Sequence, residues 1–289
     1  MTYQPPGTLY VVATPIGNLE DLTPRAARIL ESVSRIAAED TRHSARLLNH
    51  LGINKPLLSL HEHNEAHRVE ALDAYLEAGE SIALVSDAGT PLISDPGFIL
   101  VRALRLRNRH VVPVPGACAL TAALSAAGLP TDRFTFAGFL PAKAGARRQT
   151  LESYLKREET LVFYESPHRI LATLEALEEQ MPARPVVLAR ELTKTFETFL
   201  QGTPAELLAT LAEDPNQARG EFVVMIGGAS ITGASSEQAV DDETLLKTLL
   251  DEGVGVKQGA AIAAKLLGGR KKAWYERLLL MKSEAQIKP

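Results

Sequence analysis

The stretch from Leu84 to Gly97, L-V-S-D-A-G-T-P-L-I-S-D-P-G, limits what the surrounding chain can fold into. The apolar run Ile82–Val85 at its start is typical of a buried strand. Two glycines, two prolines and two aspartates then predict a loop. Asp95-Pro96 has the form of a helix N-cap followed by proline at the first helical position. This order of strand, small-residue loop and helix is typical of an open α/β sheet, where ligands bind at the carboxyl ends of strands.

The same alternation runs through the first 128 residues. Strands are expected at 8–13, 35–38, 57–60, 82–85 and 111–114. Helices are expected between them, one starting at Thr23-Pro24 and one from Pro96 to about Arg107. The loops T-P-I-G-N, E-D-T-R, S-D-A-G-T-P and P-G-A-C each follow one of these strands. Strands that alternate with helices predict a parallel sheet covered by helices.

The pattern changes after residue 130. Strand candidates lie at 134–139, 160–164, 185–189, 196–200 and 221–226, and helices fit 145–157, 166–180 and 204–213. Ser166-Pro167 predicts the beginning of the middle helix. Short connections between neighbouring strands predict a mixed sheet with antiparallel pairs, and hence a second α/β domain.

The last part of the chain has a helical pattern and an excess of basic residues. From Val254 onward there are eight Lys and Arg against two Glu, which favours nucleic-acid binding, with a solvated helical cap as the alternative. The preceding segment is rich in Gly, Ser and Thr and is typical of a linker. We therefore expect domains at 1–128 and 129–228, a linker at 229–240, and a small helical, RNA-binding domain at 241–289.

Composition and missing motifs exclude several classes of protein. A net charge of −4 argues against a general polyanion binder, so nucleic-acid contacts must come from local basic patches. The single cysteine excludes an internal disulfide, and no leader or membrane-spanning run is visible, so we expect a cytoplasmic protein without a membrane partner. The chain lacks the P-loop, the dinucleotide fingerprint and the nucleophile elbow. His61, His63 and His67 lack zinc-site spacing, so no metal is expected.

Seven motifs together are far more specific than any one of them: T-P-I-G-N-L-E-D-L-T, A-A-E-D-T-R, L-V-S-D-A-G-T-P-L-I-S-D-P-G, A-L-S-A-A-G-L-P-T-D-R-F, G-F-L-P-A-K, F-Y-E-S-P-H-R and L-A-R-E-L-T-K-T-F-E. They resemble the tetrapyrrole-methylase superfamily of S-adenosylmethionine-dependent methyltransferases, and within it the branch that methylates ribosomal RNA. The resemblance covers nearly the whole chain. Relatives that methylate small tetrapyrroles carry G-D-P where this chain has Gly89-Thr90-Pro91, and they lack the basic tail.

The resemblance implies the two-domain tetrapyrrole-methylase fold with a small C-terminal helical domain. It implies transfer of a methyl group to the ribose 2′-hydroxyl of a cytidine in the decoding region of 16S rRNA, on bare RNA or on the small ribosomal subunit. It also implies a homodimer that binds S-adenosylmethionine, folded, between the two α/β domains. The residues implied to contact this cofactor are Pro15, Gly17, Asp87, Ala88, Gly89, Thr90, Ile93, Pro115, Gly116, Ala117, Cys118, Phe139, Leu140 and Ala189.

Residue chemistry qualifies some of these expectations. Ordinary core packing is the alternative for Phe139 and Leu140. Cys118 is expected to pack rather than to act as a nucleophile, because methyl transfer needs no covalent intermediate. A ribose hydroxyl is a weak acid, so a base or a cation should help its reaction. Glu165 and Lys194 are favoured for this role.

The other candidates for the catalytic groups are Glu39, Asp40, Arg42, His168, Arg190 and Glu191, with Glu39 next in preference. RNA affinity needs cations, some of them to hold phosphates. The candidates for RNA contacts are Arg42, Lys143, Arg147, Arg148, Arg169, Arg190, Lys271 and Lys272. The arginines of 102–109 are expected to form a solvated face instead. Two other functions stay open: a small-molecule tetrapyrrole or diphthine-type methyltransferase, and a non-catalytic RNA-binding or assembly factor.

Overall fold

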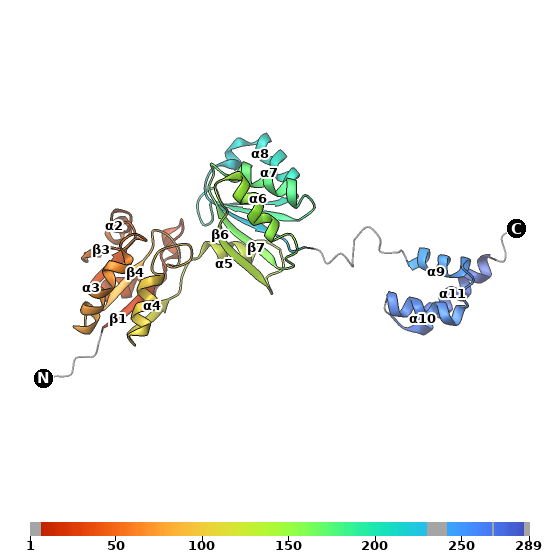
Figure 1. Ribbon diagram of the computed structural model, residues 1–289, viewed down its shortest axis with the longest axis horizontal. Coiled ribbons are helices and arrows are strands. Elements are labelled where there is room, and N and C mark those ends of the chain that lie inside the picture. The colour runs from red at the N-terminus through yellow and green to blue at the C-terminus, as the bar shows by residue number, and fades with distance from the viewer. Residues whose placement is uncertain (1–6, 230–241, 268, 286–289) are drawn as a thin grey trace. The chain divides into compact units, whose positions relative to one another are not determined.

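The computed structural model describes residues 7–229, 242–267 and 269–285, which divide into two units (Figure 1). The first unit, 1–229, contains two β-sheets, and the second, 230–289, is helical in its described part. The linker expected at 229–240 lies, apart from Ala229, outside the described residues. No described helix is long and apolar enough to cross a membrane.

The first sheet has five parallel strands in the order β3-β2-β4-β1-β5, which confirms the predicted parallel sheet. Its strands are β1 Thr8–Val12, β2 Arg35–Ala38, β3 Leu57–Ser59, β4 Ile82–Val85 and β5 His110–Val114, and its helices are α1 Pro24–Ser32, α2 Thr41–His50, α3 Glu65–Glu77 and α4 Phe98–Leu106, with a short 3₁₀ helix η1 at Leu19–Asp21. Alternate side chains of β4 point to opposite faces of the sheet. Leu84 packs with α3 and α4, and Val85 packs with α1 and α2.

Two helix starts that look alike in the sequence differ in the structure. α1 begins as predicted: the Thr23 side chain accepts a hydrogen bond from the Ala26 N–H at 3.1 Å. α4 begins at Phe98 rather than at Pro96, so the predicted Asp95 cap is wrong. Leu92 and Ser94 have left-handed φ angles of 74° and 68°, which make the preceding segment a tight loop. The N-terminus of α4 is capped by a residue of another helix.

That cap is Glu65 of α3. Its carboxylate accepts a hydrogen bond from the Leu100 N–H at 2.7 Å, and the residue is only 4% exposed. A buried carboxylate at a helix N-terminus satisfies an otherwise unpaired N–H and interacts favourably with the helix dipole. Asp95 therefore does not cap α4, and it stays part of the loop between β4 and α4.

The second sheet has the order β6-β7-β10-β8-β9, with β6 and β7 parallel and the other pairs antiparallel, as the predicted mixed sheet requires. Its strands are β6 Phe134–Phe139, β7 Thr160–Glu165, β8 Val186–Arg190, β9 Thr198–Gly202 and β10 Phe222–Ile226, and the helices beside it are α5 Ala119–Ala126, α6 Ala144–Ser153, α7 Ile170–Gln180 and α8 Pro204–Glu213, with a 3₁₀ helix η2 at Pro215–Ala218. Figure 1 shows α6, α7 and α8 gathered on one side of this sheet, where Phe163, Leu174 and Leu207 share a core.

Three expectations for this region are corrected. α7 begins at Ile170, because Ser166 and Pro167 form a turn in which the Ser166 carbonyl accepts the N–H groups of Arg169 and Ile170. β9 lies two residues later than expected. α5, expected in the first domain, packs its Leu120 on the second sheet, so the cores change before α5 and not at residue 128.

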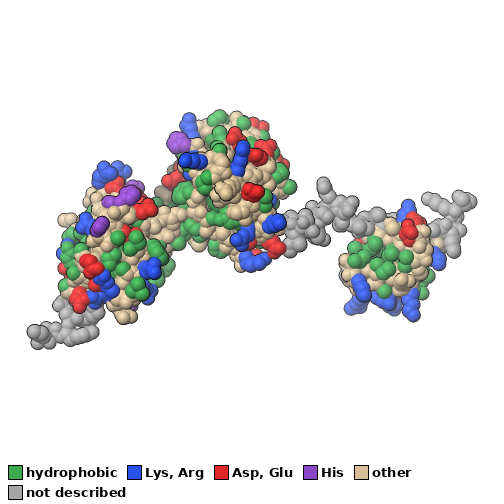
Figure 2. Space-filling view, in the orientation of Figure 1, with side chains coloured by type: hydrophobic (Ala, Val, Ile, Leu, Met, Phe, Trp, Pro, Cys, Tyr) green, Lys and Arg blue, Asp and Glu red, His purple; other side chains and the backbone are tan. Residues whose placement is uncertain are grey.

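The second unit consists of three helices in its described residues: α9 Asp242–Asp251, α10 Val256–Leu266 and α11 Lys271–Ala285. Leu246, Ala260, Ala263 and Leu278 form its core and are each 0% exposed. Lys271 and Lys272 are exposed at the start of α11. Figure 2 shows basic side chains along one side of this unit. The predicted helical tail is confirmed.

Candidate functional site

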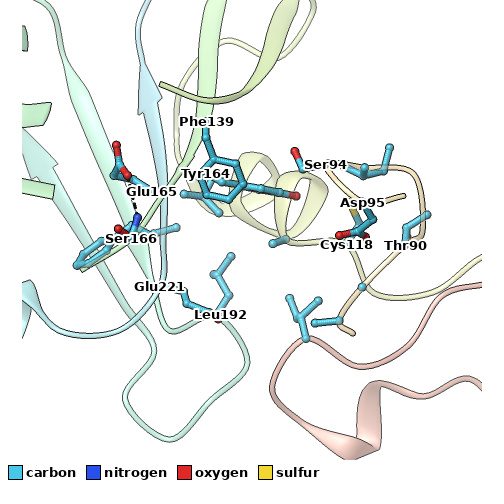
Figure 3. A pocket seen from close by; sticks show the side chains of 18 of the residues that line it. Thr90, Ser94, Asp95, Cys118, Phe139, Tyr164, Glu165, Ser166, Leu192 and Glu221 are labelled. Atoms are coloured by element: carbon cyan, nitrogen blue, oxygen red, sulfur yellow. Dashed lines mark hydrogen bonds between the residues drawn. The ribbon is translucent and has the colours of Figure 1, made fainter. Parts of the chain in front are cut away.

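A cavity of about 460 Å³ lies within the first unit, where strand-end loops of the first sheet meet one face of the second sheet (Figure 3). This volume is in the range of small-molecule sites. The residues that line it are Ile16, Ala88, Gly89, Thr90, Ile93, Ser94, Asp95, Cys118, Ala119, Phe139, Tyr164, Glu165, Ser166, Ala189, Leu192, Lys194, Glu221, Phe222 and Val223. The cavity therefore combines the loop Leu84–Gly97 with residues more than 100 positions further along.

The loop after β4 is tied to the loops after β1 and β5. Thr14 and Gly89 form an isolated antiparallel bridge, with N–H to carbonyl distances of 2.9 and 3.1 Å. Thr90 donates its hydroxyl to the Ala117 carbonyl at 3.0 Å. Gly89 has a φ of 81°, and a Cβ there would lie 3.1 Å from the Ile16 Cγ2. Glycine is required here because both the backbone conformation and the close packing disfavour a side chain.

Three carboxylates gather at this edge of the sheet. Burial raises the pKa of Asp95 to about 6. A hydrogen bond with Ser86 lowers this pKa, and the nearby charge of Asp87 raises it. Burial likewise raises the pKa of Glu39, with Asp87 and Asp95 contributing. Asp87 accepts a hydrogen bond from the Asp40 N–H at 3.0 Å. Carboxylates gathered in this way create a negative potential, which favours a cationic ligand.

The opposite wall is apolar and aromatic. The rings of Phe139 and Tyr164 meet edge to face with centroids 5.8 Å apart, and Phe139 is 54% exposed. The Tyr164 hydroxyl accepts a hydrogen bond from the Leu120 N–H at 3.2 Å. Burial raises the pKa of Tyr164 well above its usual range, so the phenol stays protonated. The small Ala189 leaves room beside these rings, and the wall therefore suits a flat ring system.

Lys194 lies at the edge of the cavity, as expected. Its Nζ is 2.9 Å from both the Glu191 Oε1 and the Glu221 Oε2. Burial lowers the pKa of Lys194, but the hydrogen bonds to the two glutamates outweigh it, so the net shift is upward and the ammonium persists. Glu191 and Thr193 have positive φ angles of 49° and 64°, a strain typical of functional loops. A Cβ on Gly17 would lie 2.4 Å from the Lys194 Cγ.

Glu165 borders the cavity, but its carboxylate faces the other side of the sheet. Its side chain is 1% exposed, and its Oε1 lies 3.1 Å from the Arg169 Nε. It also accepts hydrogen bonds from the Thr173 hydroxyl at 2.7 Å and from the Ser166 N–H at 2.9 Å. Successive side chains of a strand point to opposite faces, and Figure 3 shows the Glu165 carboxylate turned away from the Tyr164 ring. The expected role of Glu165 as a base is corrected: this carboxylate orders Arg169 and the end of β7.

The residues expected to bind the cofactor fall into three groups. Those that line the cavity are Ala88, Gly89, Thr90, Ile93, Cys118, Phe139 and Ala189. Those that lie in the loops after β1, β4 and β5 without lining it are Pro15, Gly17, Asp87, Pro115, Gly116 and Ala117. Leu140 is corrected: it is 2% exposed and packs in the core beneath α6 and α7. Glu39 does not line the cavity and acts on it only through its charge.

Several lining residues were not foreseen from the sequence: Ile16, Ser94, Asp95, Ala119, Tyr164, Ser166, Leu192, Glu221, Phe222 and Val223. Alternation along β7 could have separated Tyr164 from Glu165, because only one of the two can face the cavity. β10 is buried along its whole length, so its sequence carries no such signal. Asp95 was assigned to a helix cap that the structure does not have.

Two of the arginines expected to bind RNA are buried. Arg190 is 7% exposed and donates hydrogen bonds to the carbonyls of Arg219 at 2.6 Å, Phe196 at 3.0 Å and Asn216 at 3.1 Å. Arg147 of α6 is 6% exposed and donates a hydrogen bond to the carbonyl of Ala142, just before that helix, at 3.4 Å. Neither guanidinium is accessible to RNA, so both expectations are corrected.

The remaining basic candidates lie at the surface to different degrees. The Arg42 side chain is 89% exposed and pairs with Asp40 at 2.9 Å. Lys143 is exposed at the start of α6, and Arg148 pairs with Glu179 at 2.8 Å. Arg169 is mostly buried by its pairing with Glu165.

Two further expectations from the sequence concern the arginines of 102–109 and a metal site. Arg107 and Arg109 both bind Asp73 of α3, at 2.9 and 2.5 Å, so the arginine run forms a surface ion-pair network. Among the described residues, no group of His, Cys, Asp and Glu has an arrangement that could hold a metal ion.

Two family models match the chain. The model described as Tetrapyrrole (Corrin/Porphyrin) Methylases matches residues 8–208, and the one described as RsmI C-terminal HTH domain matches 236–282. The chain is 52% identical over 276 residues to the ribosomal RNA small subunit methyltransferase I of Pseudomonas aeruginosa, covering 94% of this chain and 97% of that one. It is 50% identical over 271 residues to the protein of that name from Escherichia coli O157:H7, covering 93% and 94%.

Solved structures agree on the fold of the first unit. Uroporphyrin-III-C-methyltransferase from Thermus thermophilus matches with a TM-score of 0.52 and 25% identity, over 76% of this chain and 94% of that one. The methyltransferase CobJ matches with a TM-score of 0.57 and 21% identity, over 77% and 95%. Another structure of the Thermus thermophilus enzyme, with a TM-score of 0.53 and 21% identity over 76% and 97%, is a complex with S-adenyl homocysteine.

Proposed function

The chain belongs to the tetrapyrrole (corrin/porphyrin) methylase family, and from this premise we propose that it transfers a methyl group from S-adenosylmethionine to the ribose 2′-hydroxyl of a cytidine in the decoding region of 16S rRNA. The observation that carries the proposal is a full-length similarity: relatives about half identical over more than nine-tenths of the chain are named ribosomal RNA small subunit methyltransferase I. The similarity continues into the basic helical tail.

The residues of the 460 Å³ cavity fit S-adenosylmethionine. Small residues at Ala88–Thr90 let a ligand approach the backbone, whose N–H groups suit a carboxylate. Phe139 and Ala189 offer an apolar place for adenine. The negative charges of Asp95 and its neighbours favour a cation at the cavity. When bound, S-adenosylmethionine supplies a methyl group on a positively charged sulfur, which is a good leaving group.

Alignment of the acceptor hydroxyl with the methyl group is then the main task of the protein. In the proposed reaction an oxygen–methyl bond forms, the sulfur–methyl bond breaks, and the hydroxyl proton passes to the Asp95 carboxylate. Asp95 faces the cavity, and its pKa of about 6 keeps it mostly ionised at neutral pH while it remains basic enough to accept a proton. The Lys194 ammonium, held by Glu191 and Glu221, stabilises the developing negative charge on oxygen.

The experiment that tests this proposal uses the full chain, methyl-labelled S-adenosylmethionine, and either 16S rRNA or small ribosomal subunits. Nuclease digestion and mass spectrometry of the product should locate the label on the 2′-oxygen of one cytidine. Label on a base, or no label on either RNA, would contradict the proposed acceptor. The two substrates also decide between bare RNA and the assembled subunit.

A second candidate function has a specific observation in its favour. The first unit shares its fold and 25% identity with a uroporphyrin-III-C-methyltransferase, so a tetrapyrrole is an alternative acceptor. The same labelled cofactor with a uroporphyrinogen substrate tests it. The match of residues 236–282 to the RsmI C-terminal model favours RNA. From the family resemblance we also propose that the protein is a homodimer and is located in the cytoplasm. Light scattering of the purified chain tests whether it is a dimer.

A further inference from the structure

A second cavity, of about 200 Å³, lies on the other side of the Thr14–Gly89 bridge. It is bounded by the loops after β1 and β4 and by one side of α2. The residues that line it are Thr14, Pro15, Leu19, His43, Ser44, Arg46, Leu47, His50, Ser86 and Asp87. Pro15 and Asp87 line this cavity, while the residues that follow them, Ile16 and Ala88, line the larger one. The two cavities are therefore neighbours, separated by the two bridged loop segments.

Ser44 carries an unused hydrogen-bonding group in this cavity. The residue is 5% exposed, and its hydroxyl oxygen is buried with no hydrogen-bond partner. Its backbone N–H is bonded in the usual helical way, to the Asp40 carbonyl at 3.0 Å, so the unused group is the side-chain hydroxyl. A buried hydroxyl without a partner costs free energy, and native structures rarely keep one unless a ligand or water completes it. Ser44 thus points to a polar ligand.

The side of α2 that meets the cavity is basic. His43, Arg46, Leu47 and His50 follow the spacing i, i+3, i+4, i+7 and so share one face of the helix. His43, Arg46 and His50 are exposed, which leaves their polar groups open to a ligand from solvent. Figure 2 shows histidine and basic side chains side by side over α2. Three nitrogen-bearing side chains on one face favour an anionic ligand such as a phosphate.

The rest of the lining suits a sugar. Among the described residues, Asp87 is the one carboxylate that lines the cavity, and one of its oxygens already accepts the Asp40 N–H at 3.0 Å. Its remaining acceptor capacity fits a hydroxyl donor. Leu19, which is 47% exposed, and Leu47 provide apolar contact of the kind that ribose carbons accept. In the part of the chain that the structure describes, histidine is the only kind of aromatic ring that lines the cavity, which therefore suits a sugar and a phosphate better than a stacked base.

We propose that this cavity holds a ribose-phosphate unit of the RNA strand, next to the nucleotide that is methylated in the larger cavity. The inference rests on the proposed function. Arg46, His43 and His50 donate hydrogen bonds to the phosphate, the Ser44 hydroxyl donates to a phosphate or ribose oxygen, and Asp87 accepts from a ribose hydroxyl. The open, exposed side of α2 lets the strand continue, and the shared wall sets the methylated nucleotide beside the larger cavity.

The test compares the double variant Arg46→Ala/His50→Ala and the single variant Ser44→Ala with matched surface controls, Arg102→Ala on α4 and His67→Ala on α3. Binding of a labelled single-stranded RNA oligonucleotide is measured by fluorescence anisotropy at several salt concentrations. The double variant should weaken RNA binding about tenfold or more and lower the salt dependence by about one or two ions, as expected for lost phosphate contacts. Ser44→Ala should weaken it about threefold, in keeping with one neutral hydrogen bond. Affinity for S-adenosyl homocysteine should not change.

Unchanged RNA affinity and salt dependence in the double variant would overturn the inference, whether or not the protein methylates RNA. Failure of the proposed function has a different signature: intact RNA binding that depends on these side chains, with no transfer of label. Equal losses in the control variants would show that the effect is one of overall charge.

Discussion

Replacement of Asp95 by Asn removes a charge that the fold disfavours. Burial raises the pKa of Asp95 from 3.8 to about 6. The folded state therefore binds this proton more tightly than the unfolded state, and the free energy of unfolding falls as the pH rises through this interval. A shift of about two pKa units corresponds to roughly 3 kcal/mol, and the partial exposure of the group reduces this to about 1–2 kcal/mol. Asp95→Asn should be more stable than the parent by this amount at pH 8, with the gain shrinking towards pH 4.

Urea unfolding at pH 8 and pH 4 measures this difference. The one tryptophan, Trp274, lies in α11 and reports on the second unit, so the first unit is followed by far-UV circular dichroism. A control variant, Asp40→Asn, should behave in the opposite way. Hydrogen bonds from Arg42 lower the pKa of Asp40 to about 2, so its charge stabilises the fold above that pH and its loss should destabilise the protein at pH 8.

The same Asp95 variant should lower kcat by about 100-fold or more, as loss of a general base does, while S-adenosyl homocysteine binds within a few-fold of the parent affinity. A gain in stability together with a loss of activity is typical of functional residues that the fold does not favour. An Asp95→Asn protein that is less stable than the parent at pH 8, or a stability difference that does not vary with pH, would refute the reasoning about burial. Full activity would refute the assignment of the proton acceptor.

Three further substitutions test other parts of the site. Gly17→Ala introduces a Cβ 2.4 Å from the Lys194 Cγ and should displace that side chain. Label transfer should fall by about tenfold or more with little change in melting temperature, because small misplacements at active sites are costly. An unchanged rate would mean that the position of Lys194 is unimportant. Arg190→Met should reduce the free energy of unfolding by about 2–4 kcal/mol, because buried carbonyl oxygens lose their donor, and urea titration would disprove the structural role if the loss were below about 0.5 kcal/mol. Glu165→Gln should destabilise the fold by about 1–3 kcal/mol through Arg169 but keep kcat within about threefold; a 100-fold loss of kcat in the folded variant would return Glu165 to catalysis.

The sequence predicts the two sheets well because their signals are local. Strands such as Ile82–Val85 are wholly apolar and are followed by helices, and Thr23-Pro24 caps α1 as local rules predict. Asp95-Pro96 has the same local pattern, but the start predicted from it is wrong, because α4 begins at Phe98. Its true cap, Glu65, is 35 positions from Leu100 in the chain. Local propensity carries no information about such a partner.

Only part of the candidate site could be predicted from the sequence, for the same reason. The small-residue loop around Gly89 is recognisable from its composition, and the structure gives it a positive φ and a bridged neighbour. The contribution of the second sheet was mostly missed, because Tyr164 and Glu165 are adjacent and only the fold decides which of them faces the cavity. Arg190 resembles a phosphate-binding cation in the sequence, but its partners are backbone carbonyls of the segment just before β9 and of the segment at and after η2. Charge can be read from a sequence, whereas burial depends on the assembled fold.

The most direct test of the account is a crystal structure of the full chain grown with S-adenosyl homocysteine. We expect its density in the 460 Å³ cavity, with the amino-acid end at the backbone of Ala88–Thr90 and the adenine beside Phe139 and Ala189. Density for this molecule at any other place, with the cavity filled by rearranged side chains, would contradict the central claim that the loop after β4 binds the methyl donor.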